Sequence, residues 1–147
     1  MKDFLLPSGV AYFPDNYMEL LRAIHSIDGT LDDEHTFHCV FSFPQRRYGK
    51  VQIVVVHGRL YFAFRCKIER REDTCKISYK VYPTAITVLS MFFAVCVMVY
   101  GFVTMLRAAN LTGVLAMAIL SAFLVGLFFV ARRSCIRQFV QKFEGYG

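Results

Sequence analysis

The sequence predicts an α+β domain followed by a two-helix transmembrane hairpin. Residues 84–106 and 111–131 are two apolar runs without a charge, separated only by Arg107–Asn110. Between residues 36 and 82, apolar and polar side chains alternate over four segments, which is the period of a half-buried β-strand. Ahead of these segments, between residues 17 and 27, apolar residues recur at helical spacing.

The two apolar runs account for an unusual composition. The chain has 147 residues, of which 56% are hydrophobic, above the roughly 45–50% of an average soluble domain. A helix needs about 20 apolar residues to cross a hydrocarbon core about 30 Å thick, and both runs are long enough. A chain this short has too little other mass to bury two such helices, so we expect both to span a membrane.

The N-terminal helix is predicted from its cap and its apolar stripe. Asn16 can cap the first turn, and Glu19 stands three positions later. The stripe consists of Leu20, Leu21, Ile24 and Ile27, and Gly29 can end the helix.

The four alternating segments predict an antiparallel meander. They cover residues 36–43, 51–56, 59–69 and 75–82, and short polar turns separate them. One face of the resulting sheet would be apolar and would carry the N-terminal helix, whereas the other would be polar and basic. The prediction is an α+β domain over residues 1–82, a hairpin over 83–131 and a basic amphipathic tail over 132–147.

The distribution of charge predicts the orientation. Residues 1–35 carry two basic and seven acidic groups, residues 36–82 ten and three, and residues 83–147 five and one. Six Lys or Arg residues lie shortly before the first span, one lies between the spans and four follow the second. By the positive-inside rule, both termini should be cytoplasmic. The start of the chain does not resemble a secretory signal, and we expect the plasma membrane as the location.

The basic residues near the spans are candidates for contact with lipid headgroups. They are Arg132, Arg133, Arg137, Lys142, Arg70 and Arg71. The tail also has an apolar stripe, formed by Ile136, Phe139, Val140 and Phe143. It is therefore either an interfacial helix that contacts anionic lipid, or a continuation of the second spanning helix that packs on the domain.

Small residues spaced by four mark a candidate helix-packing surface in the second span. Ala118, Ala122 and Gly126 would allow close approach of another helix, either the first span or a neighbouring protein. Neither span contains Asp, Glu, Lys, Arg or His. Because transporters and proton relays usually need such groups at the midplane, this argues against a conduit.

Two further features suggest ligands or modification. Five phenylalanines on the apolar face of the sheet could line a pocket for a lipid-like ligand: Phe37, Phe41, Phe43, Phe62 and Phe64. Cys135, beside the juxtamembrane arginines, is a candidate for acylation. His35, His38 and Cys39 resemble a metal site, but alternation along a strand would separate them, so we expect no metal and no cofactor.

No motif for catalysis is recognisable, and we expect a protein that is not an enzyme. The leading hypothesis is an adaptor or regulatory subunit of a membrane assembly, with its cytosolic domain held at the inner leaflet. Expected partners are membrane lipid and either another protein or a second copy of the chain, without nucleic acid. The alternative hypothesis is a membrane-anchored ligand-binding or sensory domain with an aromatic-lined pocket.

Overall fold

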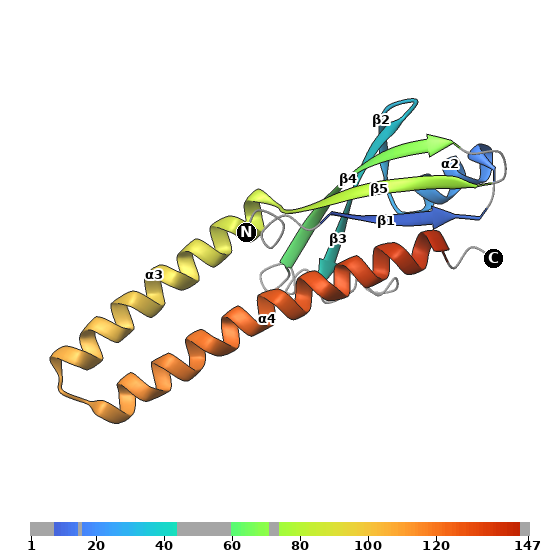
Figure 1. Cartoon of the computed structure of the whole chain (residues 1–147). Helices are drawn as coiled ribbons and strands as arrows, with labels where there is room; N and C mark the ends of the chain where they lie inside the picture. The colour runs from blue at the N-terminus through green and yellow to red at the C-terminus, as the bar shows by residue number, and fades with distance from the viewer. Residues whose placement is uncertain (1–7, 15, 44–59, 71–73, 145–147) are drawn as a thin grey trace, which may run out of the picture.

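A computed structural model describes residues 8–14, 16–43, 60–70 and 74–144. The protein has an α+β domain from which two long helices project as a hairpin (Figure 1). The elements in chain order are β1 (Ser8–Phe13), α2 (Tyr17–Ser26), β2 (Thr30–Asp33), β3 (Thr36–Phe43), β4 (Leu60–Arg70), β5 (Cys75–Pro83), α3 (Ala85–Arg107) and α4 (Leu111–Glu144).

The domain is built on an antiparallel sheet of five strands in the order β1-β5-β4-β3-β2. Three of the predicted strands are confirmed as β3, β4 and β5. The predicted strand over residues 51–56 lies outside the described residues. The prediction of four strands in a simple meander was wrong, because β1 and β2 also join the sheet.

Strand β1 lies in a segment for which no strand was predicted. Ala11 and Phe13 are fully buried, and their neighbours Val10 and Tyr12 are exposed, so the segment has the alternation of a strand. Its partner, β5, lies almost 70 residues further along the chain, which is why local reasoning missed it. Gly9 lies opposite Tyr79, and a Cβ at this position would overlap the Tyr79 hydroxyl.

Strand β2 lies in an acidic stretch for which no strand was predicted. It forms an edge hairpin with β3, with a register shift between Leu31 and Asp33. The turn is held by the His35 backbone amide, which donates to Asp33 Oδ1 at 2.7 Å and thereby lowers the pKa of Asp33. A short, charged and irregular edge strand of this kind discourages pairing with other chains.

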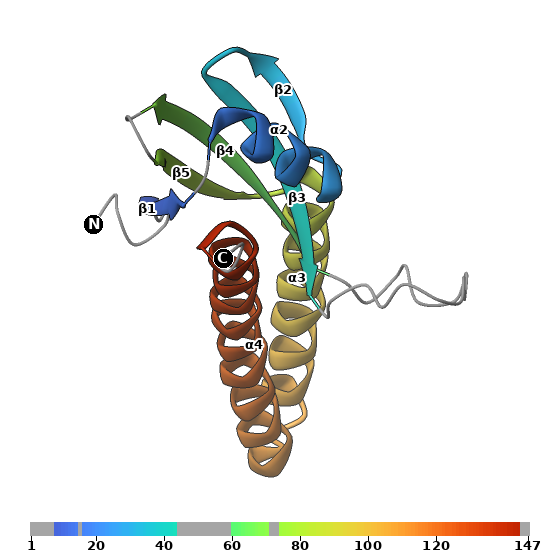
Figure 2. The ribbon, with the colours of Figure 1, turned by 90° about the vertical axis from the view of Figure 1, so that its right-hand side faces the viewer.

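The apolar face of the sheet is covered mainly by the C-terminal part of α4. Ala131, Cys135, Phe139 and Phe143 recur every fourth residue and are fully buried against it. Figure 2 shows the sheet curving over this end of α4. The prediction that the N-terminal helix covers this face was therefore incomplete, since the tail supplies two buried phenylalanines there. Of the two alternatives for the tail, the structure has the helix that continues and packs on the domain.

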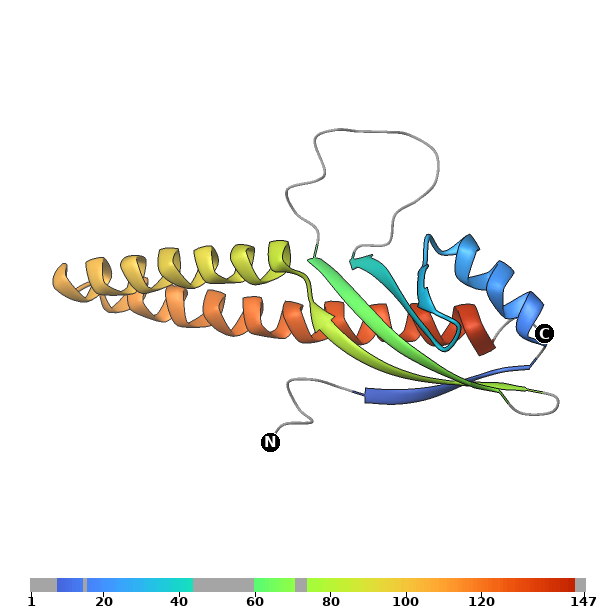
Figure 3. The ribbon, with the colours of Figure 1, turned by 90° about the horizontal axis from the view of Figure 1, so that it is seen from above.

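Helix α2 completes the core at the end of the sheet remote from the hairpin (Figure 3). Its predicted cap is confirmed, because Asn16 Oδ1 accepts a hydrogen bond from the Glu19 backbone amide at 3.1 Å. Leu20 and Ile24 of the predicted stripe are buried, together with Ala23. The helix thus closes the core where α4 ends.

A buried polar junction joins α3 to the sheet. The Thr87 side chain, in the first turn of α3, is fully buried. Its hydroxyl donates to the Tyr61 carbonyl at 2.8 Å and accepts from the Tyr61 amide at 2.7 Å. The Thr84 amide also donates to the Tyr61 carbonyl, at 3.0 Å. These bonds fix the direction in which the chain leaves β5.

Helices α3 and α4 pack side by side along the hairpin. Close approach is permitted at Gly101, which lies against Met117, and at Gly113, which lies against Met105. Both helices are long and apolar enough to cross a membrane, and most of their large apolar side chains are exposed. Helix α3 matches the first predicted span to within one residue at each end, and α4 begins where the second was predicted but continues to Glu144.

Candidate functional site

The outward face of the sheet carries a group of basic side chains on β4 and β5. Alternation along β4 and β5 turns Arg65, Lys67, Lys76 and Lys80 away from the core. The helices α2 and α4 contribute their buried residues to the opposite face, and no described helix lies over the outward face. None of the described helices therefore prevents a ligand or partner from reaching this surface.

The register of the sheet brings three of these cations together. Arg65 lies directly opposite Lys80, and Lys67 lies opposite Ser78, one pair further along the same two strands. On the neighbouring strands, Ser8 of β1 pairs with Lys80, and Thr36 of β3 pairs with Lys67. The sequence predicted a basic face, but it could not show which cations are neighbours across strands.

These residues surround a shallow hollow of about 550 Å³, which we call the basic depression. It extends over β1, β5, β4 and β3. Its lining is formed by Ser8, Gly9, Val10, Thr36, Arg65, Cys66, Lys67, Ser78, Tyr79 and Lys80. Three of these strands, β1, β3 and β5, bring hydroxyl groups whose position depends on long-range pairing, and β1 was not predicted at all.

Other charged groups on this face are paired with each other. Lys76 Nζ lies 3.2 Å from Glu69 Oε2, and His38 Nδ1 lies 2.8 Å from Asp32 Oδ1 at the β2 edge. Both contacts are exposed and contribute little to stability, and His38 carries a positive charge only when it is protonated. Glu69 thus neutralises Lys76, whereas Arg65, Lys67 and Lys80 form no ion pair among the described residues.

The residues predicted to contact headgroups fall at different distances from the hairpin. Arg132 and Arg133 lie within one turn of the predicted end of the second span. Arg137 and Lys142 lie further along α4, beside the sheet. Arg70 is at the far end of β4, where its guanidinium stacks 3.6 Å above the Tyr17 ring. Arg71 lies outside the described residues.

The predicted helix-packing surface is not part of the contact between α3 and α4. Ala118, Ala122 and Gly126 are all exposed, and a Cβ on Gly126 would have no neighbour within 4 Å. The hairpin instead packs through glycines and methionines. The three small residues therefore face outward.

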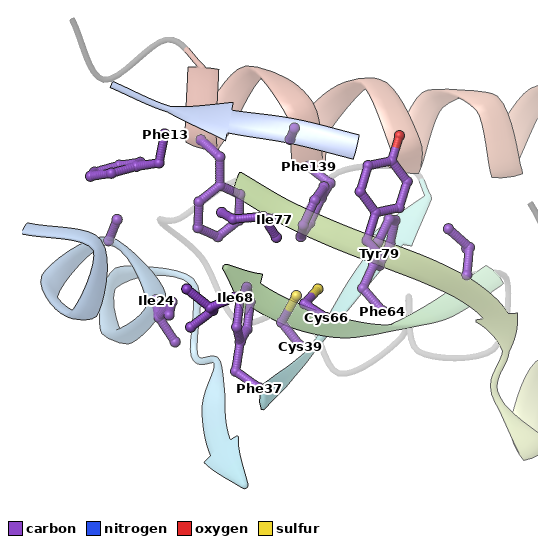
Figure 4. Packing of buried hydrophobic residues seen from close by; sticks show 14 of the residues in the cluster. Phe13, Ile24, Phe37, Cys39, Phe64, Cys66, Ile68, Ile77, Tyr79 and Phe139 are labelled. Carbon is purple, nitrogen blue, oxygen red and sulfur yellow. The ribbon is translucent and has the colours of Figure 1, made fainter. Parts of the chain in front are cut away.

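The five phenylalanines predicted to line a pocket are covered by α4. Phe37, Phe62 and Phe64 are fully buried, and Phe41 and Phe43 are partly buried against the same core. Phe64 stacks on Phe139 with ring centroids 4.7 Å apart. Rings of α4 also pack on Phe37, Phe41 and Phe62 (Figure 4 shows the centre of this cluster). The alternative hypothesis of an open aromatic pocket loses its basis, because α4 fills the face.

The cysteines of the domain behave as small apolar side chains. Cys39 and Cys66 lie together in the core (Figure 4), and burial together with the Cys39 thiol raises the pKa of Cys66. Burial raises the pKa of Cys135 to about 12. Because the Cys135 thiol is buried and neutral in the folded domain, it is poorly placed for acylation.

No group of three or more His, Cys, Asp and Glu residues is arranged to hold a metal ion in the described parts of the chain. His38 is exposed on the outward face, and Cys39 is buried on the other. Their separation follows the alternation expected from the sequence. The candidate site is therefore the basic depression, not a metal centre or an apolar pocket.

Comparison of the chain with models of protein families, with curated proteins and with solved structures finds no match.

Proposed function

We propose that the chain is a two-pass membrane protein that holds a non-catalytic recognition domain at the cytoplasmic surface. In this proposal it acts as an adaptor or regulatory subunit. The observation that carries the proposal is the continuity of α4. One helix of 34 residues begins in the apolar hairpin and ends in the core of the domain.

Exposed apolar surface supports insertion of the hairpin. Large side chains such as Phe92, Phe93, Leu111 and Phe123 are each more than 60% exposed. Soluble monomers rarely expose contiguous apolar patches larger than a few hundred Å². Two adjacent helices with such side chains along their length are stable in hydrocarbon, because their apolar surface is then not exposed to water.

The charge distribution supports the cytoplasmic placement of the domain. Helix α3 ends at Arg107, the one basic residue at this end of the hairpin, since residues 108–110 between the helices are uncharged. The opposite end of the hairpin is flanked by the basic residues of the domain and of α4. The positive-inside rule therefore favours both termini in the cytoplasm.

Continuity of α4 supports a role in which the domain is positioned rather than loosely tethered. A helix rises 1.5 Å per residue, so the part from Ala131 to Phe143 extends about 18 Å along the sheet. Thr87 fixes α3 to the same sheet. A partner bound to the domain would therefore be held in a defined orientation relative to the membrane.

The outward-facing small residues of α4 support lateral contact in the bilayer. In a two-helix hairpin, Ala118, Ala122 and Gly126 expose a surface on which another helix can pack closely. We expect the occupant to be a protein of the same membrane or a second copy of the chain. The polar outward face of the sheet would remain available at the same time.

The proposal is tested by locating exposed positions relative to the membrane. Single cysteines introduced as Ala108→Cys in the loop and Gln141→Cys on α4 are treated with a membrane-impermeant thiol reagent. We expect Ala108→Cys to react in intact cells and Gln141→Cys only after permeabilisation. Extraction of the unmodified chain by carbonate, or the reverse pattern of labelling, would contradict the proposal.

The adaptor role is tested by purification in mild detergent. We expect a stoichiometric partner or a homo-oligomer, and Gly126→Leu should reduce its recovery because the larger side chain prevents close helix contact. Ala116→Leu, at another exposed position of α4, is the matched control. A clean monomer for the unmodified chain would count against the role.

A further inference from the structure

The three cations of the basic depression are not paired with a carboxylate among the described residues, although Glu69 lies two residues from Lys67 on the same face of β4. Arg65 and Lys80 are directly opposite across β4 and β5, and like charges in this arrangement destabilise a sheet. Neither of them, nor Lys67, forms an ion pair within residues 8–14, 16–43, 60–70 and 74–144. Lys76, on the same strand and face as Lys80, is paired with Glu69. An anion bound in the depression would remove the repulsion.

The groups around the depression suit phosphate oxygens. The Arg65 guanidinium can donate two parallel hydrogen bonds to a phosphate, and Lys67 and Lys80 supply ammonium donors. The hydroxyls of Ser8 and Ser78 stand beside them and can also donate, whereas the Thr36 side chain hydrogen-bonds to the Asp33 carboxylate. A hollow of about 550 Å³ lies within the roughly 300–1,000 Å³ range of small-molecule sites.

The spacing of the cations favours more than one phosphate. Cross-strand neighbours have Cβ atoms about 5 Å apart and diagonal neighbours about 7 Å apart. Three positive charges are balanced by two phosphate groups, since each carries roughly −1.5 to −2 near neutral pH. A diphosphate or triphosphate therefore matches both the charge and the spread of the three side chains.

The position of the depression favours a ligand from solution over the headgroup of a bulk lipid. Lys80 precedes Thr84, the cap of α3, by four residues of extended chain. At about 3.3 Å per residue this is roughly 13 Å, and β5 runs along the direction of α4 (Figures 1 and 3). The headgroup layer outside the hydrocarbon is only about 5–8 Å thick. The three cations thus stand beyond it.

We infer that the basic depression binds a soluble organic diphosphate or triphosphate through Arg65, Lys67 and Lys80. The inference deepens the proposed function and rests on it for the placement of the site beside a membrane. It specifies the class of ligand that the adaptor domain recognises. Binding would neutralise the outward face of a sheet whose other face is attached to α4.

The test is a calorimetric titration of the full chain in phosphatidylcholine nanodiscs, with inorganic pyrophosphate as the probe. We expect Arg65→Gln and Lys80→Gln each to weaken binding about tenfold or more, because each removes a charge-assisted contact. Lys76→Gln is the matched control and should change affinity less than about twofold. Pyrophosphate should also raise the unfolding midpoint of the unmodified protein but not that of Lys80→Gln.

A second readout separates a binding role from a structural one. Without ligand, Arg65→Gln should unfold at a temperature equal to or higher than the unmodified chain, because the substitution relieves repulsion with Lys80. A marked loss of thermal stability in Arg65→Gln would mean that the cation supports the fold, and would overturn the inference.

Several results would overturn the ligand class. They are absence of pyrophosphate binding, equal weakening by Lys76→Gln, and tighter binding of a polyglutamate peptide than of pyrophosphate. Binding only to separate vesicles that contain phosphatidylinositol phosphates would assign the site to a lipid instead. Failure of the hairpin to insert would contradict the proposed function, whereas phosphate binding can be measured in detergent regardless of insertion.

Discussion

Phe139 links the last helix of the chain to three strands of the sheet. Its ring lies 4.7 Å from Phe64 of β4, 4.9 Å from Tyr79 of β5 and 6.0 Å from Phe41 of β3, measured between centroids. The side chain is fully buried. Aromatic pairs contribute about 0.5–1.5 kcal/mol beyond the area that they bury, so this position concentrates much of the contact between α4 and the sheet.

We expect Phe139→Ala to lower the free energy of unfolding by about 3–5 kcal/mol, because it removes a buried ring and leaves a cavity. The measurement is denaturant unfolding of the detergent-solubilised chain. Gln141→Ala, at an exposed position of the same helix, is the control. Equal stability of the two variants would show that α4 does not pack on the sheet in this way.

A second residue-scale prediction concerns the buried hydroxyl at the start of α3. Thr87→Val keeps the shape but leaves the Tyr61 amide without this partner, whereas the Tyr61 carbonyl still accepts from the Thr84 amide. An unsatisfied buried group costs about 1–3 kcal/mol, so we expect a lower unfolding midpoint. Thr104→Val, which removes only an exposed bond to the Gly101 carbonyl, should have a much smaller effect. Similar unfolding midpoints for Thr87→Val and Thr104→Val would show that the hydrogen bonds of Thr87 do not stabilise the fold.

At the scale of elements, α4 has two environments along one axis. The first part packs on α3 through Met117 and other apolar residues, and the last part packs on the sheet through its buried stripe. A break between the two parts should leave both able to form but no longer coupled. Arg133 stands at the boundary and is exposed.

We therefore expect Arg133→Pro to separate domain folding from membrane insertion. Proline inside a helix costs about 3 kcal/mol or more, so the tail should dissociate from the sheet more often. Limited proteolysis should cleave the domain faster than in Arg133→Ala, while carbonate extraction leaves both variants in the membrane fraction. Unchanged proteolysis would mean that the domain does not depend on a continuous α4.

At the scale of the whole molecule, the hairpin and the domain share one core. Helix α4 joins them through apolar contacts, and Thr87 joins them through hydrogen bonds. Buried cysteines lie in this core, where thiolates are strongly disfavoured. The titration of these thiols therefore connects the stability of the whole domain to pH.

We expect stability to be constant near neutral pH and to fall in alkaline solution. In the unfolded chain the thiols ionise near pH 8.5, whereas burial raises the pKa of Cys66 and raises that of Cys135 to about 12. Above pH 8.5 the folded state binds more protons than the unfolded state, so the free energy of unfolding decreases. The slope approaches about 1.4 kcal/mol per pH unit for each thiol.

The measurement is the unfolding midpoint between pH 7 and pH 10. In Cys135→Ala one of these thiols is absent, so the alkaline loss should be shallower even if the variant is less stable at pH 7. An equally steep loss of stability with pH in this variant would show that ionisation of Cys135 does not contribute to alkaline unfolding.

Local sequence patterns determined both long helices, α2 and three strands of this protein, whereas long-range pairing determined β1 and the candidate site. Uncharged runs of about 20 residues, alternation in three strands and the Asn16 cap depend on neighbours in the chain, so the sequence alone was enough to predict them. The role of the tail depended on the shape that the sheet offers, and the place of β1 on a partner almost 70 residues away. Arg65 and Lys80 became neighbours only through the register of β4 and β5, because spacing along one strand carries no information about its partner.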